Sequence, residues 1–198
     1  MRDASATRSR LLVAAMTVFA ETGYAGATTR AIAERAGVNE VTLFRHFGSK
    51  ADLMTEVMAS QLGKLMPQFA APSGDLEQDL IRIVTAYQEM VGTHARFIVT
   101  ALSDVPRFPE LKGVSDVPRR MIAAVAGMMA RYQQEGLLQE EPAPVMAASL
   151  LTPLLFLAIA RQSAPDLIGN GIDPALHVHR FLRGRLVEPT SAQKHASA

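Results

Sequence analysis

The sequence predicts an all-α protein from three observations. Apolar residues recur at the 3.6-residue spacing of amphipathic helices, Gly and Pro fall at the ends of these segments, and no stretch shows strand-like alternation. A chain of 198 residues, 48% of them hydrophobic, is long enough for a small N-terminal domain and a larger second domain, each with a core. Counting the periodic segments, we expect about nine helices.

The first two expected helices follow one another closely. Apolar residues at helical spacing predict a helix from about residue 7 to residue 22, and Gly23 can end it without steric cost. The next helix should begin at Thr28, whose hydroxyl can accept a hydrogen bond from a free backbone N–H, and should end before Gly37. The first helix would then support the segment that follows it.

A third helix should begin after a tight turn, with Asn39 as its cap. Its apolar anchors and its hydrogen-bonding side chains occupy different faces. Two short helices joined by a turn of three or four residues form a helix-turn-helix, whose second helix reads the major groove of DNA. Residues 28–50 therefore predict a DNA-binding motif, with the helix after Asn39 as its recognition helix.

The fourth helix has its own start signal. Ser49 and Asp52 have capping-box spacing, so a helix should begin there, and it should end before Pro67. Residues 67–75 are rich in Pro, Ala, Ser and Gly and predict a loop.

Five further periodic segments complete the expected helices. They are residues 76–91, 97–102, 121–132, 142–163 and 173–188. We expect three parts: a helix-turn-helix domain over residues 1–50, a helical domain over 51–188, and a disordered tail over 189–198.

Residues 143–160 are apolar on nearly every face. This length only just reaches that of a membrane span, Pro153 lies in its middle, and no second such segment exists. A helix that is buried all round in a soluble protein has the same composition. Composition alone fits the buried helix and the membrane span equally well.

Composition and charge narrow the function. The absence of Cys excludes disulfides, thiolate zinc sites and Cys nucleophiles, and it fits a reducing cytoplasm. Residues 1–50 carry seven Arg and Lys against four Asp and Glu, a net charge of +3, whereas the whole chain carries +1. A basic region beside a helix-turn-helix can follow the phosphate backbone, because neutralised phosphates release counterions. For residues 1–7 a solvated tail is the alternative.

An ordered set of short motifs runs through residues 8–53. They are Phe19-Ala20-Glu21-Thr22-Gly23-Tyr24, Thr28-Thr29, Ile32-Ala33, Ala36-Gly37-Val38, and Leu43-Phe44-Arg45-His46-Phe47 followed by Lys50. This order resembles the DNA-binding domain of the tetracycline-repressor-like (TetR) transcriptional regulators. The resemblance implies a three-helix DNA-binding domain, followed by a larger helical domain that binds a ligand and forms a dimer.

The resemblance also implies which side chains meet DNA. They are Thr28, Thr29, Arg30, Asn39, Val41, Thr42, Phe44, Arg45, His46 and Lys50. The resemblance places the Thr29 hydroxyl on a DNA phosphate, and we expect Lys50, in the first turn of its helix, to bind a phosphate as well. Asn can pair with adenine, and Val or Thr can touch a thymine methyl. The family commonly has Tyr-Tyr-His-Phe where this chain has Phe44-Arg45-His46-Phe47, so a phenolic donor is lost and a guanidinium is gained. We expect Arg45 to bind phosphate, with a guanine edge as the alternative.

The implied dimer would bind a palindromic operator. It would form through the helices spanning residues 142–163 and 173–188, packed against their counterparts in a four-helix interface. The resemblance therefore favours a helix over 142–163 that is apolar toward its own core and toward the partner, rather than a membrane span. The implied effector pocket is lined by Met58, Met66, Tyr87, Met90, His94, Met121, Val125 and Met128. Thioethers adapt to ligands of varied shape, although these methionines could instead fill a core.

The resemblance implies a ligand-responsive repressor. A TetR-like activator and a DNA-binding protein without an effector remain as alternatives. An enzyme is disfavoured, because no nucleophile, acid–base pair or metal-binding set occurs at a recognisable spacing. We expect double-stranded DNA and a small hydrophobic effector as partners, no cofactor, no membrane contact and a cytoplasmic location.

Overall fold

The computed structural model describes residues 2–69, 72–169 and 171–186, and these residues form nine α-helices and two short 3-10 helices. The α-helices are α1 (Arg2–Gly26), α2 (Thr29–Arg35), α3 (Glu40–Phe47), α4 (Lys50–Leu65), α5 (Leu76–Asp104), α6 (Lys112–Gln134), α7 (Ala143–Ser163), α8 (Pro165–Ile168) and α9 (Pro174–Leu182). The 3-10 helices are η1 (Met66–Phe69) and η2 (Pro109–Leu111). The all-α prediction is confirmed for these residues, and the expected tail over residues 189–198 lies outside them.

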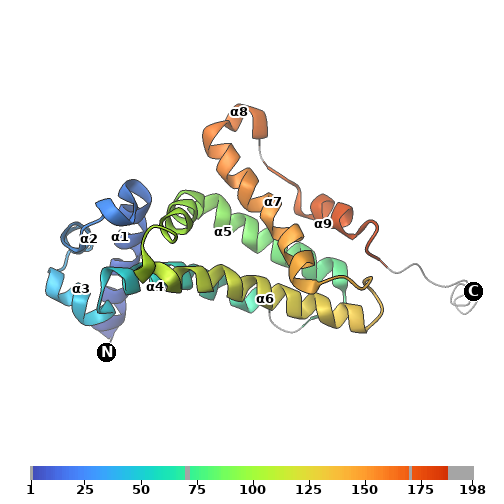
Figure 1. Cartoon of the computed structure of the whole chain (residues 1–198), viewed down its shortest axis with the longest axis horizontal. Helices are drawn as coiled ribbons and strands as arrows, with labels where there is room; N and C mark the ends of the chain where they lie inside the picture. The colour runs from blue at the N-terminus through green and yellow to red at the C-terminus, as the bar shows by residue number, and fades with distance from the viewer. Residues whose placement is uncertain (1, 70–71, 170, 187–198) are drawn as a thin grey trace, which may run out of the picture.

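Helices α1 to α3 form one end of the molecule, and α5, α6, α7 and α9 form the rest (Figure 1). Helix α4 begins at the N-terminal end and packs against α1, α5 and α6. One continuous cluster of buried apolar side chains runs through both parts, from Leu11 and Phe19 in α1 to Leu154 in α7. The N-terminal helices therefore share a core with the helices behind them.

The predicted helix starts are confirmed by hydrogen bonds. The Thr28, Asn39 and Ser49 side chains accept from the backbone N–H groups of residues 31, 42 and 52. At the fourth helix the Asp52 carboxylate departs from the capping-box pattern, because it accepts from the Ser49 hydroxyl at 2.6 Å while the Ser49 N–H bonds to Phe47.

Several expected helix boundaries are wrong. Helix α1 already begins at Arg2, and α5 runs unbroken to Asp104, so the two segments 76–91 and 97–102 are one helix. A glycine inside a helix, such as Gly92, lowers helix stability by only about 1 kcal/mol relative to alanine. The burial of apolar side chains before and after it in α5 outweighs that cost. Helix α6 starts at Lys112 and includes Pro118, well before the expected start at residue 121.

Helix α9 ends at Leu182, not at residue 188, because the following chain pairs with a distant segment. The Gln139 N–H donates to the Arg185 carbonyl at 2.8 Å, and Leu138 and Leu186 form an isolated bridge. The sequence also gave no sign of the separate short helix α8.

Helices α5 and α6 are tied together by a buried carboxylate. Asp79 is 2% exposed and accepts hydrogen bonds from the Tyr132 hydroxyl at 2.7 Å and from the Ser73 N–H at 2.8 Å. Burial disfavours the charged form, but these hydrogen bonds outweigh it and hold the pKa of Asp79 below its usual range. Burial and the neighbouring carboxylate raise the pKa of Tyr132 to about 12.

A second buried carboxylate joins the N-terminal helices to α5. Gly23 interrupts α1 with φ 69° and ψ 177°, as its predicted role as a helix stop requires. This break releases the Tyr24 N–H from the helix, and the N–H donates to the Asp104 Oδ2 at 2.8 Å. Asp104 is 7% exposed and lies at the C-terminal end of α5. We call these three residues, together with Lys50, the α1–α5 junction.

Lys50, the first residue of α4, closes the junction from the other side. Its ammonium donates to the carbonyls of Tyr24 at 2.8 Å and Ala27 at 3.0 Å, and it lies 4.3 Å from the centre of the Tyr24 ring. Burial lowers the pKa of Lys50, although the negative charge of Glu110 partly opposes this. The ammonium therefore holds together the loop between α1 and α2.

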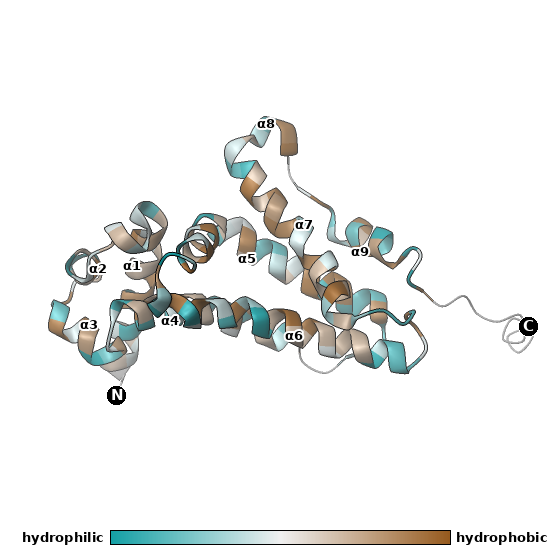
Figure 2. Ribbon diagram, viewed as in Figure 1, coloured by the Kyte–Doolittle hydropathy of each residue, from teal (hydrophilic) through white to brown (hydrophobic). Residues whose placement is uncertain are grey.

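Helix α7 is the least covered of the long helices. Met146, Leu150 and Leu154 are buried on one face, whereas Val145 and Phe156 on the opposite face are 61% and 66% exposed. Its outer part and α8 extend away from α5, and much of the helix is brown or tan in the hydropathy colouring, with hydrophilic residues toward its outer end (Figure 2). By length and composition alone α7 could span a membrane, but the core helix of a soluble protein passes the same test.

The α1–α5 junction generates a stability prediction. Asp104→Ala leaves the buried Tyr24 N–H without an acceptor, so the free energy of unfolding should fall by about 1–3 kcal/mol. Urea unfolding measures this change, and the Tyr24 amide should also exchange its hydrogen faster.

Asp116→Ala is the matched control, because Asp104 and Asp116 each lie 3.9 Å from an Arg three residues later. The Asp116 side chain is 63% exposed, so this variant should change stability by no more than about 0.5 kcal/mol. Equal effects of the two substitutions would show that the junction contributes no more than a surface ion pair.

Candidate nucleic-acid interface

Helix α3 is fixed to the body of the domain through one face. Leu43 and Phe47 are buried against the neighbouring helices. The Arg8 guanidinium lies 5.1 Å from the centre of the Phe47 ring and forms a 2.6 Å ion pair with Glu56 of α4. Sequence reasoning did not find this role of Arg8. Because α1, α2 and α4 all contact the inner face of α3, its outer face has a defined orientation.

The outer face of α3 combines apolar and cationic side chains. Val41 is 74% exposed and Phe44 is 45% exposed, and Arg45 lies beside them at positions that share one helix face. In the described residues, Arg45 has no hydrogen bond or ion pair. An apolar group can contact a thymine methyl, and a guanidinium can bind phosphate or guanine. This face therefore has the chemistry that a major-groove contact needs.

The predicted contact residues at the start of α2 are already engaged with protein groups. The Thr28 hydroxyl accepts from the Ala31 N–H at 3.1 Å, and the Thr29 hydroxyl donates to the Glu40 carboxylate. Arg30 pairs with Glu34 at 2.9 Å, and both side chains are well exposed. Such a surface pair contributes little stability, so a phosphate could replace Glu34 at little cost.

Glu40 is a residue that sequence reasoning missed. It lies in the first turn of α3 and holds the hydroxyl of Thr29, which is a predicted phosphate contact. A phosphate at that hydroxyl would have to displace the carboxylate and would then lie near its negative charge. Glu40 thus opposes phosphate binding at the position where the sequence predicts it.

The other predicted DNA-contact residues differ in how exposed and how engaged their side chains are. The Asn39 side chain caps α3, while Thr42 and His46 are half-buried at the edge of its outer face. Lys50 uses two of its three N–H groups inside the α1–α5 junction. A phosphate contact by Lys50 stays a prediction, and it is limited to the one remaining donor.

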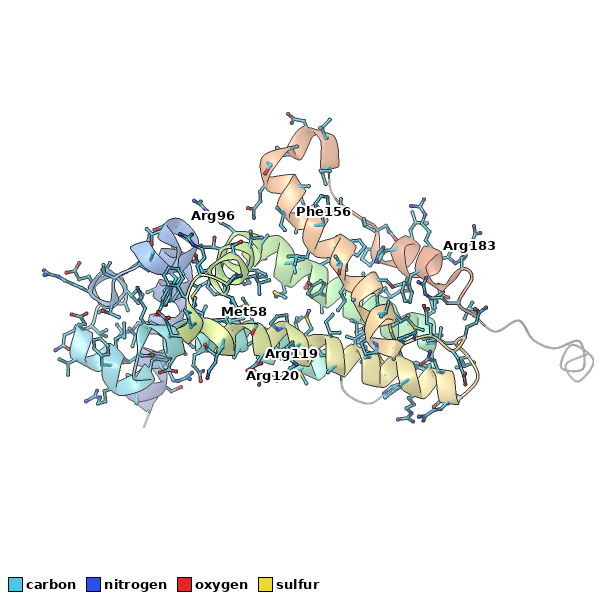
Figure 3. All side chains as sticks on the ribbon, in the orientation of Figure 1. Met58, Arg96, Arg119, Arg120, Phe156 and Arg183 are labelled. Atoms are coloured by element: carbon cyan, nitrogen blue, oxygen red, sulfur yellow. The ribbon has the colours of Figure 1, made fainter. Side chains whose placement is uncertain are left out.

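The predicted effector residues lie only partly in one cavity. Met58, Tyr87, Met90 and Met121 line a cavity of about 60 Å³ between α4, α5, α6 and α7. Gln61, which is 5% exposed, also lines this cavity, although it was not among the effector residues predicted from the sequence. The label of Met58 in Figure 3 marks its place beside α6.

The other four predicted effector residues do not line this cavity. Val125 and Met128 are buried in the core, Met66 is 44% exposed in η1, and His94 is half-buried. Burial and the positive charge of Lys64 lower the pKa of His94. Helical spacing placed Val125 and Met128 on the correct helix, but it could not show which residues face a common space. Among the described residues, no cluster of His, Asp or Glu is arranged to bind a metal ion.

Comparison with known proteins agrees with this geometry. The family model described as "Bacterial regulatory proteins, tetR family" matches residues 11–57, which include α2, α3 and the start of α4. The chain is 29% identical to the uncharacterized HTH-type transcriptional regulator YvkB of Bacillus subtilis over 137 residues, 67% of this chain and 71% of that protein. It is 27% identical to the HTH-type transcriptional regulator UidR of Escherichia coli over 169 residues, covering 83% and 86%.

Solved structures share the whole fold. A putative transcriptional regulator from Saccharomonospora viridis, solved in complex with choline, matches 93% of this chain and all of its own length. The TM-score is 0.71 and the sequence identity is 21%, so this match concerns the fold alone. The motif and the sequence relatives lead to one conclusion: residues 11–57 match the DNA-binding domain of the tetR family of bacterial regulatory proteins, and the chain is a DNA-binding transcriptional regulator.

Proposed function

We propose that this regulator is a homodimeric, ligand-responsive repressor that binds a palindromic operator through its two α3 helices. The outer face of α3 carries this proposal, because Val41 and Phe44 are exposed apolar side chains beside the guanidinium of Arg45. Exposed apolar groups on a rigid helix are typical of a surface that meets a partner. Residues 1–50 would act as the DNA-binding domain and residues 51–188 as the effector-binding and dimerisation domain, in the cytoplasm.

The exposed face of α7 supports the dimer. Val145 and Phe156 lie on the side of α7 that no other described element covers, and Leu176 of α9 is 44% exposed. Packing α7 and α9 against their counterparts would remove this apolar surface from water. A twofold dimer would place its recognition helices in successive major grooves, which requires half-sites about one helical turn apart or a multiple of that distance.

The cavity supports an effector that acts through α4. Its volume of about 60 Å³ is well below the roughly 300–1,000 Å³ of small-molecule sites. An effector can enter only if the surrounding helices move apart. Met58, Gln61 and Leu65 of α4 form one wall, so an effector there would displace α4. Because Lys50 begins α4 and clamps the α1–α2 loop, this displacement would reach the DNA-binding helices.

An activator is the second candidate, because the same linkage could favour DNA binding. A repressor lowers transcription when it binds its promoter, whereas an activator raises it, and this difference distinguishes the two functions. Transcription from the bound promoter should rise when the gene for a repressor is deleted, and it should fall when the gene for an activator is deleted.

Arg45 tests the DNA-binding surface. If its guanidinium binds phosphate, Arg45→Ala should weaken binding to all DNA sequences alike. The slope of log affinity against log salt concentration should then fall by about 0.9 for each lost contact, or roughly 2 for a dimer. Operator binding at several salt concentrations measures this, and Arg131→Ala, at the far end of α6, is the control.

The alternative role of Arg45 has a different signature. If the guanidinium contacts guanine, the salt slope should change little, and the loss should concentrate at one base pair per half-site at a cost of about 1–3 kcal/mol. Binding to single-base operator variants would reveal this pattern, which would contradict the phosphate assignment.

Phe156 tests the dimer. Light scattering by the wild-type protein at micromolar concentration should give a molecular mass of about twice the 21.4 kDa of one chain. Phe156→Asp places a charge in the proposed interface and should shift the population to monomers. Val13→Asp, at a 62% exposed position of α1, should leave the dimer intact. A monomeric wild-type protein would rule out both the interface and the palindromic operator.

Linkage tests the effector site. A thermal-shift screen of lipophilic compounds should yield ligands that weaken operator binding, and by linkage the operator must weaken their binding by the same factor. Met121→Phe, which fills the cavity, should remove the effect, whereas Met66→Phe, outside the cavity, should retain it. Ligands whose affinity is the same with and without operator would contradict the coupling.

A further inference from the structure

A second hollow lies on the opposite side of α5 from the core of the N-terminal domain. It has a volume of about 300 Å³ and is bounded by α5, the outer half of α7, α8 and the segment before α9. Its walls are mostly apolar, with Leu154, Leu157 and Ile172 among them. It shares no lining residue with the 60 Å³ cavity. We call this hollow the α5–α7 groove.

Gln88 supplies an unsatisfied acceptor at the groove. Its Nε2 donates to the Ile172 carbonyl at 3.0 Å, and because a carbonyl can only accept, this bond fixes which end of the amide is the donor. The Oε1 is buried and has no hydrogen-bond partner among the described residues. Because this oxygen has almost no accessible surface, a ligand N–H or O–H can reach it only after the groove wall shifts, and the contact would then supply the hydrogen bond that the buried acceptor lacks.

Arg161 supplies a positive charge on the other wall. It is exposed, it lines the groove from α7, and it forms no ion pair with the described residues. A guanidinium binds carboxylates through paired hydrogen bonds. The groove thus offers an apolar wall, one neutral acceptor and one cation.

The walls of the groove face inward from α7. Leu154, Leu157 and Arg161 recur at three- and four-residue spacing, on the face that continues the buried row of α7. Phe156, labelled in Figure 3, belongs to the opposite, exposed face. A dimer built on that exposed face would therefore leave the groove available.

We propose that the α5–α7 groove is a binding site for a small amphiphilic acid: an apolar chain with one hydroxyl or amide donor for the Gln88 Oε1 and one carboxylate for Arg161. A volume of about 300 Å³ lies at the lower end of the range for small-molecule sites. This site differs from the proposed effector cavity in place and in polarity. It does not depend on that cavity or on the sign of regulation.

Hydroxyoctanoates are the probes that test the site. Calorimetric titration of the full chain should show binding of 2-, 3- or 8-hydroxyoctanoate, a series that varies the distance between donor and carboxylate. The best of these should bind about 10-fold more tightly than octanoate, which lacks the donor. It should also bind more tightly than the corresponding octanediol, which lacks the carboxylate.

Two variants assign the polar contacts. Gln88→Met should remove the preference for the hydroxylated acid over octanoate, and Arg161→Met should remove the preference for the acid over the diol. If Gln88→Met fails to fold, Arg161→Met at its exposed position still tests the carboxylate contact.

Gly92→Leu tests the place of binding. Gly92 lines the groove within α5, and a Cβ added there would meet no atom within 4 Å, so leucine should fold there and occupy the space. Gly127→Leu is the matched control, because Gly127 is another helical glycine with open space around it and it lies outside the groove.

Binding that is lost in Gly92→Leu and kept in Gly127→Leu supports the site. The proposal is overturned if no hydroxyoctanoate binds, or if Gly92→Leu binds as tightly as the wild type. It is also overturned if Gly92→Leu disrupts the dimer, because a second copy of the chain would then fill the groove.

Discussion

Within the apolar core that the DNA-binding helices share with the rest of the molecule, the backbone N–H of Tyr24 makes the buried hydrogen bond that joins α1 to the end of α5. Gly23 breaks α1 and frees this group, and the Asp104 carboxylate at the end of α5 accepts its hydrogen bond. The Lys50 ammonium holds the carbonyl of the same residue. Because Tyr24 and Asp104 are buried, their hydrogen bond cannot break without leaving groups that water does not immediately reach, and the half-buried Lys50 adds two further hydrogen bonds to the same place. The position of α2 and α3 therefore depends on α4 and α5.

The helices around the small cavity are closely packed, and this packing links the α1–α5 junction to the proposed regulation. The space between α4, α5 and α6 is too small for most ligands, so a bound molecule must displace a helix that forms its wall. Helix α4 contributes to that wall at one end and to the junction at the other. The proposed coupling needs no long chain of contacts, because one helix connects the two places.

Exposed apolar side chains occur at two positions that an isolated subunit does not explain. Val41 and Phe44 lie on the outer face of α3, and Val145 and Phe156 lie on the outer face of α7. Both faces belong to helices whose opposite sides are firmly packed, so the exposure is not a result of loose structure. A DNA groove and a second subunit are the partners that would cover them.

The sequence by itself determined the elements that local chemistry controls, whereas the tertiary structure decided how far helices extend and which side chains meet. Thr28, Asn39 and Ser49 cap helices where expected, because each acts on a backbone group within three residues. The union of 76–91 and 97–102 into α5 depended on packing that outweighs one glycine. The roles of Lys50, Asp104 and Gln88 could not be read from spacing, because their partners lie 23 to 84 residues away along the chain. Only the folded chain brings such distant groups within hydrogen-bonding distance.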